Sequence, residues 1–157
     1  MKTIQNWLDD YAVSHQNPTN KLVHFVCVPV IFFTVVALFY SIPVPGVPRI
    51  GLIEVNVATV ALLLVTLYYL RLSFTLAIGM FLFSLLCLII SDNIMLHSSK
   101  GNLALTAVVL FILAWIAQFW GHKVEGKKPS FIKDLQFLMI GPAWIMSFIY
   151  KKMGISY

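Results

Sequence analysis

The chain has 157 residues, of which 60% are hydrophobic and only 11% are charged, and its net charge is +5. Soluble domains hold nearer a quarter of charged residues, so this composition excludes an ordinary globular domain and indicates an integral membrane protein. It also argues against nucleic acid as a partner, because no soluble basic domain is present to bind it. An anionic lipid surface or an anionic substrate suits the positive charge better.

The first expected element is a short amphipathic helix at the N-terminus. Apolar and aromatic side chains, with one histidine, recur there at three- and four-residue spacing and share one face: Ile4, Trp7, Leu8, Tyr11 and His15. Asn17 and Pro18 then suit an N-cap followed by proline at the first helical position. The first long helix should therefore begin at about Pro18.

Four apolar runs approach the length of about 20 residues that a helix needs to cross a bilayer core. The expected membrane spans cover residues 20–41, 52–70, 74–91 and 103–120. A fifth apolar segment, 131–150, is shorter and contains Gly141 and Pro142, where proline kinks a helix. We expect this segment to be re-entrant or interfacial, because a fifth full span would carry Lys151 and Lys152 to the less basic side. The sequence thus predicts an all-α integral membrane protein with a single membrane domain.

The distribution of Lys and Arg predicts the orientation of the spans. With four spans, the more basic side holds Lys2, Lys21, Arg71, Lys123, Lys127, Lys128 and Lys133. The other side holds Arg49 and Lys100. We therefore expect a cytoplasmic N-terminus, in the inner membrane of a bacterium or the endoplasmic reticulum of a eukaryote.

This topology brings three of the four histidines to the same, cytoplasmic face. His15 precedes the first span, His24 lies about one turn inside it, and His122 stands at the end of the fourth span. Glu125 follows His122 at i+3, whereas His97 falls at the opposite face. Three imidazoles and a carboxylate suit a divalent transition metal, including Fe(II) in non-haem oxygen chemistry. The ligand set alone does not choose between iron and zinc.

Nearby polar residues admit two interpretations of this cluster. Asn17, Asn20 and Gln118 are candidates to hydrogen bond the imidazoles and fix their tautomers. Alternatively, the histidines are amphipathic interface residues in a non-enzymatic membrane protein that binds lipid or a protein partner. Asp92 and His97 are expected to be polar groups at a helix end.

Two motifs carry a resemblance to a known family. The segment HQNPTNKLVH before the first span, together with QFWGHKVEGKKP after the fourth, is similar to the membrane 2-hydroxy fatty acid dioxygenases. This is the family of the metabolism of phytosphingosine to odd-numbered fatty acids, and the resemblance covers essentially the whole chain. It implies an Fe(II)-dependent α-oxidation, in which a 2-hydroxy fatty acid reacts with O2, loses C1 as CO2 and becomes one carbon shorter.

The resemblance also implies roles for particular residues. The motif histidines of the family fall on His15, His24 and His122, and its motif glutamate falls on Glu125, as catalytic residues and metal ligands. A carboxylate head group would sit at the membrane surface, where Lys21 or Lys123 would neutralise it. The chain departs from the family pattern in its last apolar stretch, which has no acidic residue where members often carry one.

Overall fold

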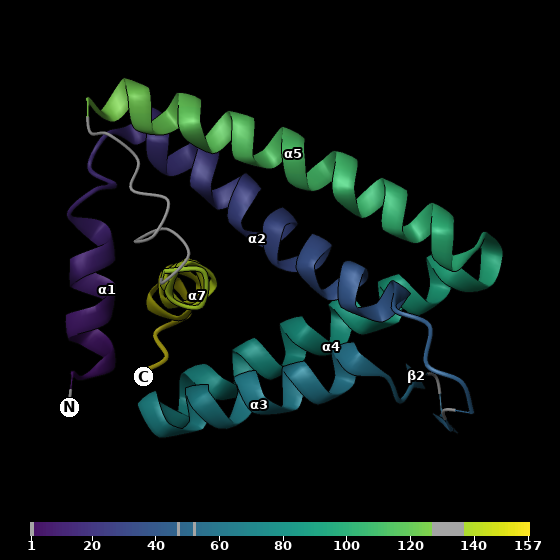
Figure 1. Cartoon of the computed structure of the whole chain (residues 1–157). Helices are drawn as coiled ribbons and strands as arrows, with labels where there is room; N and C mark the ends of the chain where they lie inside the picture. The colour runs from purple at the N-terminus through teal and green to yellow at the C-terminus, as the bar shows by residue number, and fades with distance from the viewer. Residues whose placement is uncertain (1, 47, 52, 127–136) are drawn as a thin grey trace.

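The computed structural model describes residues 2–46, 48–51, 53–126 and 137–157, and this part of the chain is almost entirely helical (Figure 1). The helices are α1 (Ile4–Ala12), α2 (Pro18–Ser41), α3 (Val57–Leu72), α4 (Phe74–His97), α5 (Lys100–Glu125) and α7 (Ile140–Met153). A small antiparallel hairpin pairs β1 (Arg49–Ile50) with β2 (Ile53–Glu54). The expectation of an all-α protein is confirmed for the described residues.

Local sequence signals set the beginnings of α1 and α2. The Thr3 side chain accepts a hydrogen bond from the backbone of α1, whose buried face consists of Ile4, Leu8 and Tyr11. Asn17 caps α2 by accepting the Thr19 N–H at 2.8 Å, and Pro18 follows at the first helical position. The capping prediction is confirmed, because capping depends only on neighbouring residues. The predicted face is confirmed for Ile4, Leu8 and Tyr11, but Trp7 is half-buried, and His15 lies beyond the helix because α1 ends at Ala12.

Three of the described helices are long and apolar enough to cross a membrane: α2, α4 and α5, with 24, 24 and 26 residues. Helix α3 is equally apolar but has only 16 residues, which is short of the usual span of about 20. Helix α4 continues past residue 91, where we expected the third span to end, as far as His97. Asp92 therefore lies inside α4 and not after it. A charged side chain is tolerated there because Arg49 pairs with it.

The long helices form two pairs that run across Figure 1. Helices α2 and α5 lie side by side, and α3 and α4 form a tight hairpin in which Ser73 both ends α3 and caps α4. Helix α7 is seen end-on between these pairs, so it crosses them at a steep angle (Figure 1). The two ends of the chain lie at the same end of the bundle, beside α1 and α7. We call this the near end, and the end that carries the hairpin the far end.

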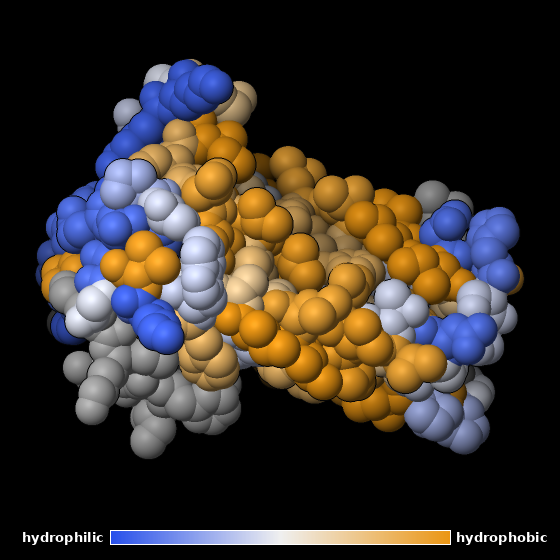
Figure 2. All heavy atoms as spheres, turned by 90° about the horizontal axis from the view of Figure 1, so that it is seen from above, coloured by the Kyte–Doolittle hydropathy of each residue, from blue (hydrophilic) through white to orange (hydrophobic). Residues whose placement is uncertain are grey.

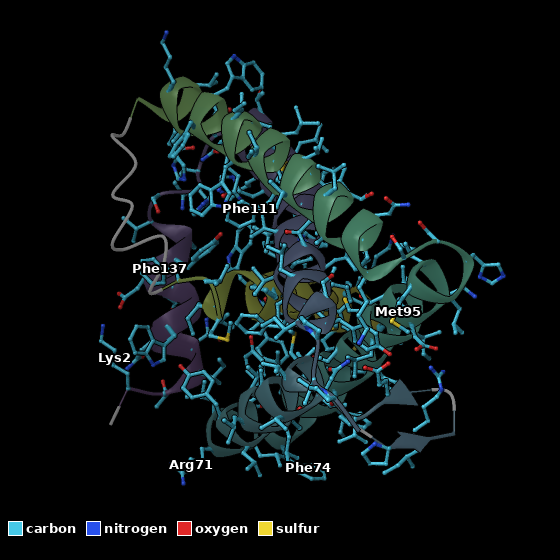
Figure 3. All side chains as sticks on the ribbon, turned by 45° about the vertical axis from the view of Figure 1, so that its right-hand side comes forward. Lys2, Arg71, Phe74, Met95, Phe111 and Phe137 are labelled. Atoms are coloured by element: carbon cyan, nitrogen blue, oxygen red, sulfur yellow. The ribbon has the colours of Figure 1, made fainter. Side chains whose placement is uncertain are left out.

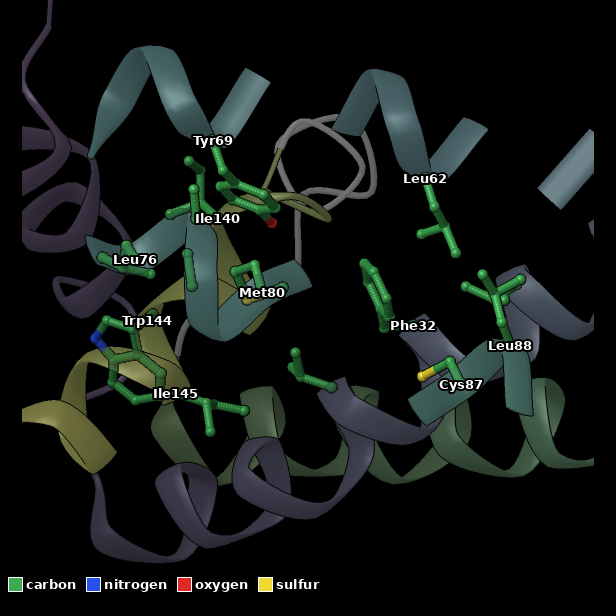
Figure 4. Close-up of a cluster of buried hydrophobic side chains, with 14 of the residues drawn as sticks. Phe32, Leu62, Tyr69, Leu76, Met80, Cys87, Leu88, Ile140, Trp144 and Ile145 are labelled. Carbon is green, nitrogen blue, oxygen red and sulfur yellow. The ribbon is translucent and has the colours of Figure 1, made fainter. Parts of the chain in front are cut away.

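The hydrophobic core joins α2, α3, α4 and α7 (Figure 4). Its labelled members include Phe32, Tyr69, Met80 and Trp144. Two hydroxyl groups fix the C-terminal segment to the α3–α4 hairpin: Tyr69 donates to the Met139 carbonyl, and Tyr150 donates to the Thr75 carbonyl. Because of these contacts, α7 belongs to the packed bundle.

The surface shows the polarity expected of a membrane protein (Figure 2). A hydrophobic belt covers the middle of the face seen there, and hydrophilic residues gather at both ends. In α5 the exposed apolar residues include Leu105, Val109, Ile112, Leu113 and Ile116. The re-entrant or interfacial placement of the C-terminal segment stays a prediction, and residues 131–136 of that segment lie outside the described residues, as do Lys127, Lys128 and Lys133.

Candidate metal centre

Three histidines meet at the near end of the bundle, although they come from three different places in the chain. His15 lies in the linker between α1 and α2, His24 lies in α2, and His122 lies in the last turn of α5. All three side chains are buried, with 1%, 2% and 4% of their surface exposed. The structure therefore brings together the three histidines that the predicted topology places at one face.

The three imidazole rings are close enough to share one ion. The ring centroid of His15 is 4.2 Å from that of His24 and 5.3 Å from that of His122. The centroids of His24 and His122 are 4.9 Å apart. One nitrogen from each ring lies within 4.8 Å of the nitrogens chosen from the other two. A group of this kind can hold a metal ion.

Two of the rings have their tautomer set by the backbone. Nδ1 of His15 donates to the Tyr11 carbonyl at 2.6 Å, and Nδ1 of His24 donates to the Asn20 carbonyl at 3.0 Å. A carbonyl can only accept, so Nδ1 carries the proton and Nε2 of a neutral ring carries the lone pair. Metal-binding histidines commonly donate their second ring N–H to a carbonyl in this way.

Glu125 binds the backbone of the α1–α2 linker. Its Oε1 accepts the Gln16 N–H and its Oε2 accepts the Asn17 N–H, both at 2.8 Å, and the Asn20 side-chain amide donates to Oε2 at 3.2 Å. These amides precede and begin α2, where the helix dipole favours a negative charge. The carboxylate thus ties the end of α5 to the linker that carries His15. The three-histidine group does not include Glu125.

A close approach of α2 and α5 makes this arrangement possible. A Cβ atom at Gly121 would lie 2.5 Å from Oδ1 of Asn20 and 3.4 Å from Cγ1 of Val23. A Cβ atom at that distance would force Asn20 or the helix to shift, so glycine lets α5 come close enough to place His122 beside His24.

Aromatic rings from both termini enclose His15. Tyr11 stacks on its imidazole with centroids 4.2 Å apart, and Trp144 of α7 lies at 5.5 Å. Phe137 packs against Tyr11 and Trp7, and Figure 3 shows it beside α1. The spacing of Tyr11 places it on the buried face of α1, but nothing local to Trp144 indicates a contact with a residue so far away in the chain.

The other predicted site residues lie around this cluster. Gln118 is buried and borders a cavity together with His24. Lys21 is half-buried in the first turn of α2, and Lys123 is exposed beside His122. His97 is exposed at the far end of α4, where its Nδ1 donates to the Asn93 carbonyl at 2.9 Å. His97 is thus separate from the other three histidines.

A second buried polar group lies at the far end around Asp92, which the sequence predicts only as a polar residue at a helix end and without partners. Asp92 accepts hydrogen bonds from the Tyr40 hydroxyl at 2.6 Å and from both terminal nitrogens of Arg49 at 3.1 and 2.7 Å. These hydrogen bonds raise the pKa of Arg49 above its ordinary value. The sequence does contain a signal for this contact, namely an acidic residue next to an apolar run. Acidic residues in membrane helices are usually paired with another charged or polar group.

The described residues thus form a helical bundle with helices apolar enough for a membrane and with a buried three-histidine cluster at one end. A family model described as 2-hydroxy-palmitic acid dioxygenase Mpo1-like matches residues 1–153, and the chain belongs to this family. It is 30% identical over 153 residues to the 2-hydroxy-palmitic acid dioxygenase MPO1 of Saccharomyces cerevisiae, an alignment that covers 94% of this chain and 80% of the yeast protein. No solved structure matches the chain. The family resemblance that the two motifs carry is confirmed.

Proposed function

We propose that the protein is a 2-hydroxy fatty acid dioxygenase whose metal is Fe(II), held by His15, His24 and His122. The observation that carries this proposal is the convergence of these three buried imidazoles in a member of a dioxygenase family. The donor set fits the ion, because nitrogen ligands suit iron and two of the rings already donate Nδ1–H to carbonyls.

The overall reaction balances without a further reductant. A 2-hydroxy acid, R–CH(OH)–COOH, and O2 give R–COOH, CO2 and water, and the C1–C2 bond breaks. The substrate loses four electrons and O2 gains four. Bound Fe(II) would supply the oxygen chemistry, while the protein binds the substrate and excludes bulk water.

The residues around the cluster would position the reactants. Lys21 lies one turn before His24 in α2 and Lys123 follows His122 in α5, so both would attract the substrate carboxylate as it approaches the cluster. Tyr11 and Trp144 cover His15 and would keep water away. We assign Glu125 a positioning role, because its two oxygens hold the linker amides that fix His15 relative to α5. No acidic residue in α7 is needed for this arrangement.

The near end would face the cytoplasm. The described elements that meet at this end carry most of the described basic residues: Lys2 precedes α1, Lys21 lies in the first turn of α2, Arg71 and Lys123 lie in the last turns of α3 and α5, and Lys151 and Lys152 lie in the last turn of α7. The far end carries Arg49 and Lys100. Figure 3 shows Lys2 and Arg71 on the side opposite Met95. An excess of Lys and Arg marks the cytoplasmic side of a membrane protein.

The decisive experiment measures metal and turnover on the same detergent-purified protein. After anaerobic loading with Fe(II), elemental mass spectrometry should find about one iron per chain. Adding O2 and 2-hydroxypalmitate labelled with 13C at C1 should then release labelled CO2 and unlabelled pentadecanoate. Zinc in place of iron would keep the site and overturn the oxygenase. Absence of any bound metal would favour a non-enzymatic protein that binds lipid or a partner.

A further inference from the structure

A cavity of about 30 Å³ opens beside the three-histidine cluster. His24, Tyr11 and Gln118 form its polar side, and Val28, Ile31 and Leu138 are among its apolar lining residues. A space of this size holds a small polar group. The cavity is therefore polar toward the cluster and apolar toward the middle of the bundle.

A second cavity of about 70 Å³ lies between α2 and α3 and is lined only by apolar side chains. Phe32, Val35 and Phe39 contribute from α2, and Ala61 contributes from α3. Leu138 lines both cavities, so one side chain forms their common boundary.

The two cavities follow one face of α2. Their lining residues His24, Val28, Ile31, Val35 and Phe39 are spaced by three or four positions, which places them along a single stripe. Fifteen residues of helix span about 22 Å. This stripe runs from the polar cluster almost to the far end of α2, and it is comparable in length to an extended long acyl chain.

We propose that the two cavities form one binding groove for the substrate, with the carboxyl end in the histidine cavity and the alkyl chain passing Leu138 into the space between α2 and α3. This inference rests on the proposed function, and it adds the path of the chain and the residues that select its length. The groove carries no polar group beyond Leu138, so a hydrophilic tail has no hydrogen-bond partner there. An aliphatic tail has no hydrogen bonds to water that it would lose on entering this cavity.

A chain-length experiment tests the groove. Ala61→Phe narrows its middle and should lower kcat/KM for 2-hydroxypalmitate about tenfold to hundredfold, the range expected when a pocket loses room for methylenes. The value for 2-hydroxyoctanoate should stay within about twofold, because the shorter chain ends near Leu138. Leu64→Phe is the matched control: Leu64 is on the same helix but 62% exposed, so both acids should keep their kcat/KM. If Ala61→Phe leaves the ratio of the kcat/KM values for the two acids unchanged, the proposed groove is overturned.

A second measurement on the unaltered protein requires no turnover. A 2-hydroxypalmitate that carries a diazirine near its methyl end should label α2 and α3 around Phe39 and Ala61 on illumination. Excess 2-hydroxypalmitate should suppress the labelling and excess phospholipid should not, which distinguishes the substrate from an ordinary lipid tail. Labelling spread over exposed residues of α5, such as Ile112 and Leu113, would overturn the groove. Specific labelling without turnover would overturn the proposed function and leave the groove intact.

Discussion

At the far end of the bundle, buried Asp92 accepts hydrogen bonds from Tyr40 and Arg49, and Lys100 pairs with Glu54 at 2.9 Å. At the near end, three buried imidazoles converge with ring centroids 4.2 to 5.3 Å apart. The far end pairs each carboxylate with a cation, so its interactions can be explained by the protein alone. The near end brings together three imidazoles, a donor set that suits a metal cation from outside. Buried polarity can therefore indicate a structural contact in one region and a binding site in another.

The largest expected effect follows from removing one of the near-end nitrogens. His24→Ala should reduce bound iron from about one equivalent to almost none and abolish turnover, because two imidazoles hold the ion far less well than three. His97→Ala is the matched control, since His97 is exposed at the far end and should leave metal content unchanged. Equal iron content in the two variants, measured by elemental mass spectrometry, would show that the near-end histidines do not hold the metal.

The next effect concerns the close approach of α2 and α5. Gly121→Ala places a methyl group 2.5 Å from Oδ1 of Asn20, so either the buried Asn20 side chain or one of the two helices must shift. We expect a loss of about 1–3 kcal/mol in stability and weaker iron binding. Gly101→Ala is the control in the same helix, because its nearest neighbour, Oγ of Ser99, would be 3.8 Å away. Thermal unfolding in detergent measures both, and identical melting temperatures would contradict the steric argument.

A substitution at Glu125 distinguishes a positioning role of its carboxylate from direct ligation of the metal. Glu125→Gln keeps one acceptor oxygen but loses the charge, so the linker amides of Gln16 and Asn17 should be held less firmly. We expect iron affinity to fall about tenfold to hundredfold, as for other residues that orient ligands, with one equivalent still bound at saturation. Anaerobic titration with Fe(II) gives both values. A complete loss of binding would show that the carboxylate itself ligates the metal.

The smallest effect is expected at the far end. Tyr40→Phe removes a buried hydroxyl that donates to Asp92, which should cost about 1–2 kcal/mol in stability. Iron content and turnover should not change, because the Asp92–Arg49 pair remains and the near end is untouched. Tyr68→Phe, at a side chain with 38% exposure, should change neither stability nor iron content. Loss of iron in Tyr40→Phe would mean that the two ends of the bundle are coupled and that the far end is more than a structural contact.

Much of the near end could be predicted from the sequence because it depends on local signals. Asn17 and Pro18 fix where α2 begins, and the spacing from Ile4 to Tyr11 fixes the buried face of α1. Alternating directions of successive apolar runs then bring His15, His24 and His122 to one level. The ring distances could not be predicted, since they depend on the contact between Gly121 and Asn20, two residues far apart in the chain.

Composition and periodicity were sufficient to predict the apolar helices of a membrane protein, the start of α2 and the grouping of the histidines, because they reflect neighbouring residues. The contacts of Glu125, the aromatic ring of α7 that covers His15 and the partners of Asp92 became clear only from the folded bundle. These contacts join residues that are tens of positions apart in the chain. The sequence around one residue of such a pair does not indicate which residue its partner is. The packing of the C-terminal segment on the α3–α4 hairpin belongs to the same class, because it includes the hydroxyl contacts of Tyr69 and Tyr150 with residues 70 and 75 positions away.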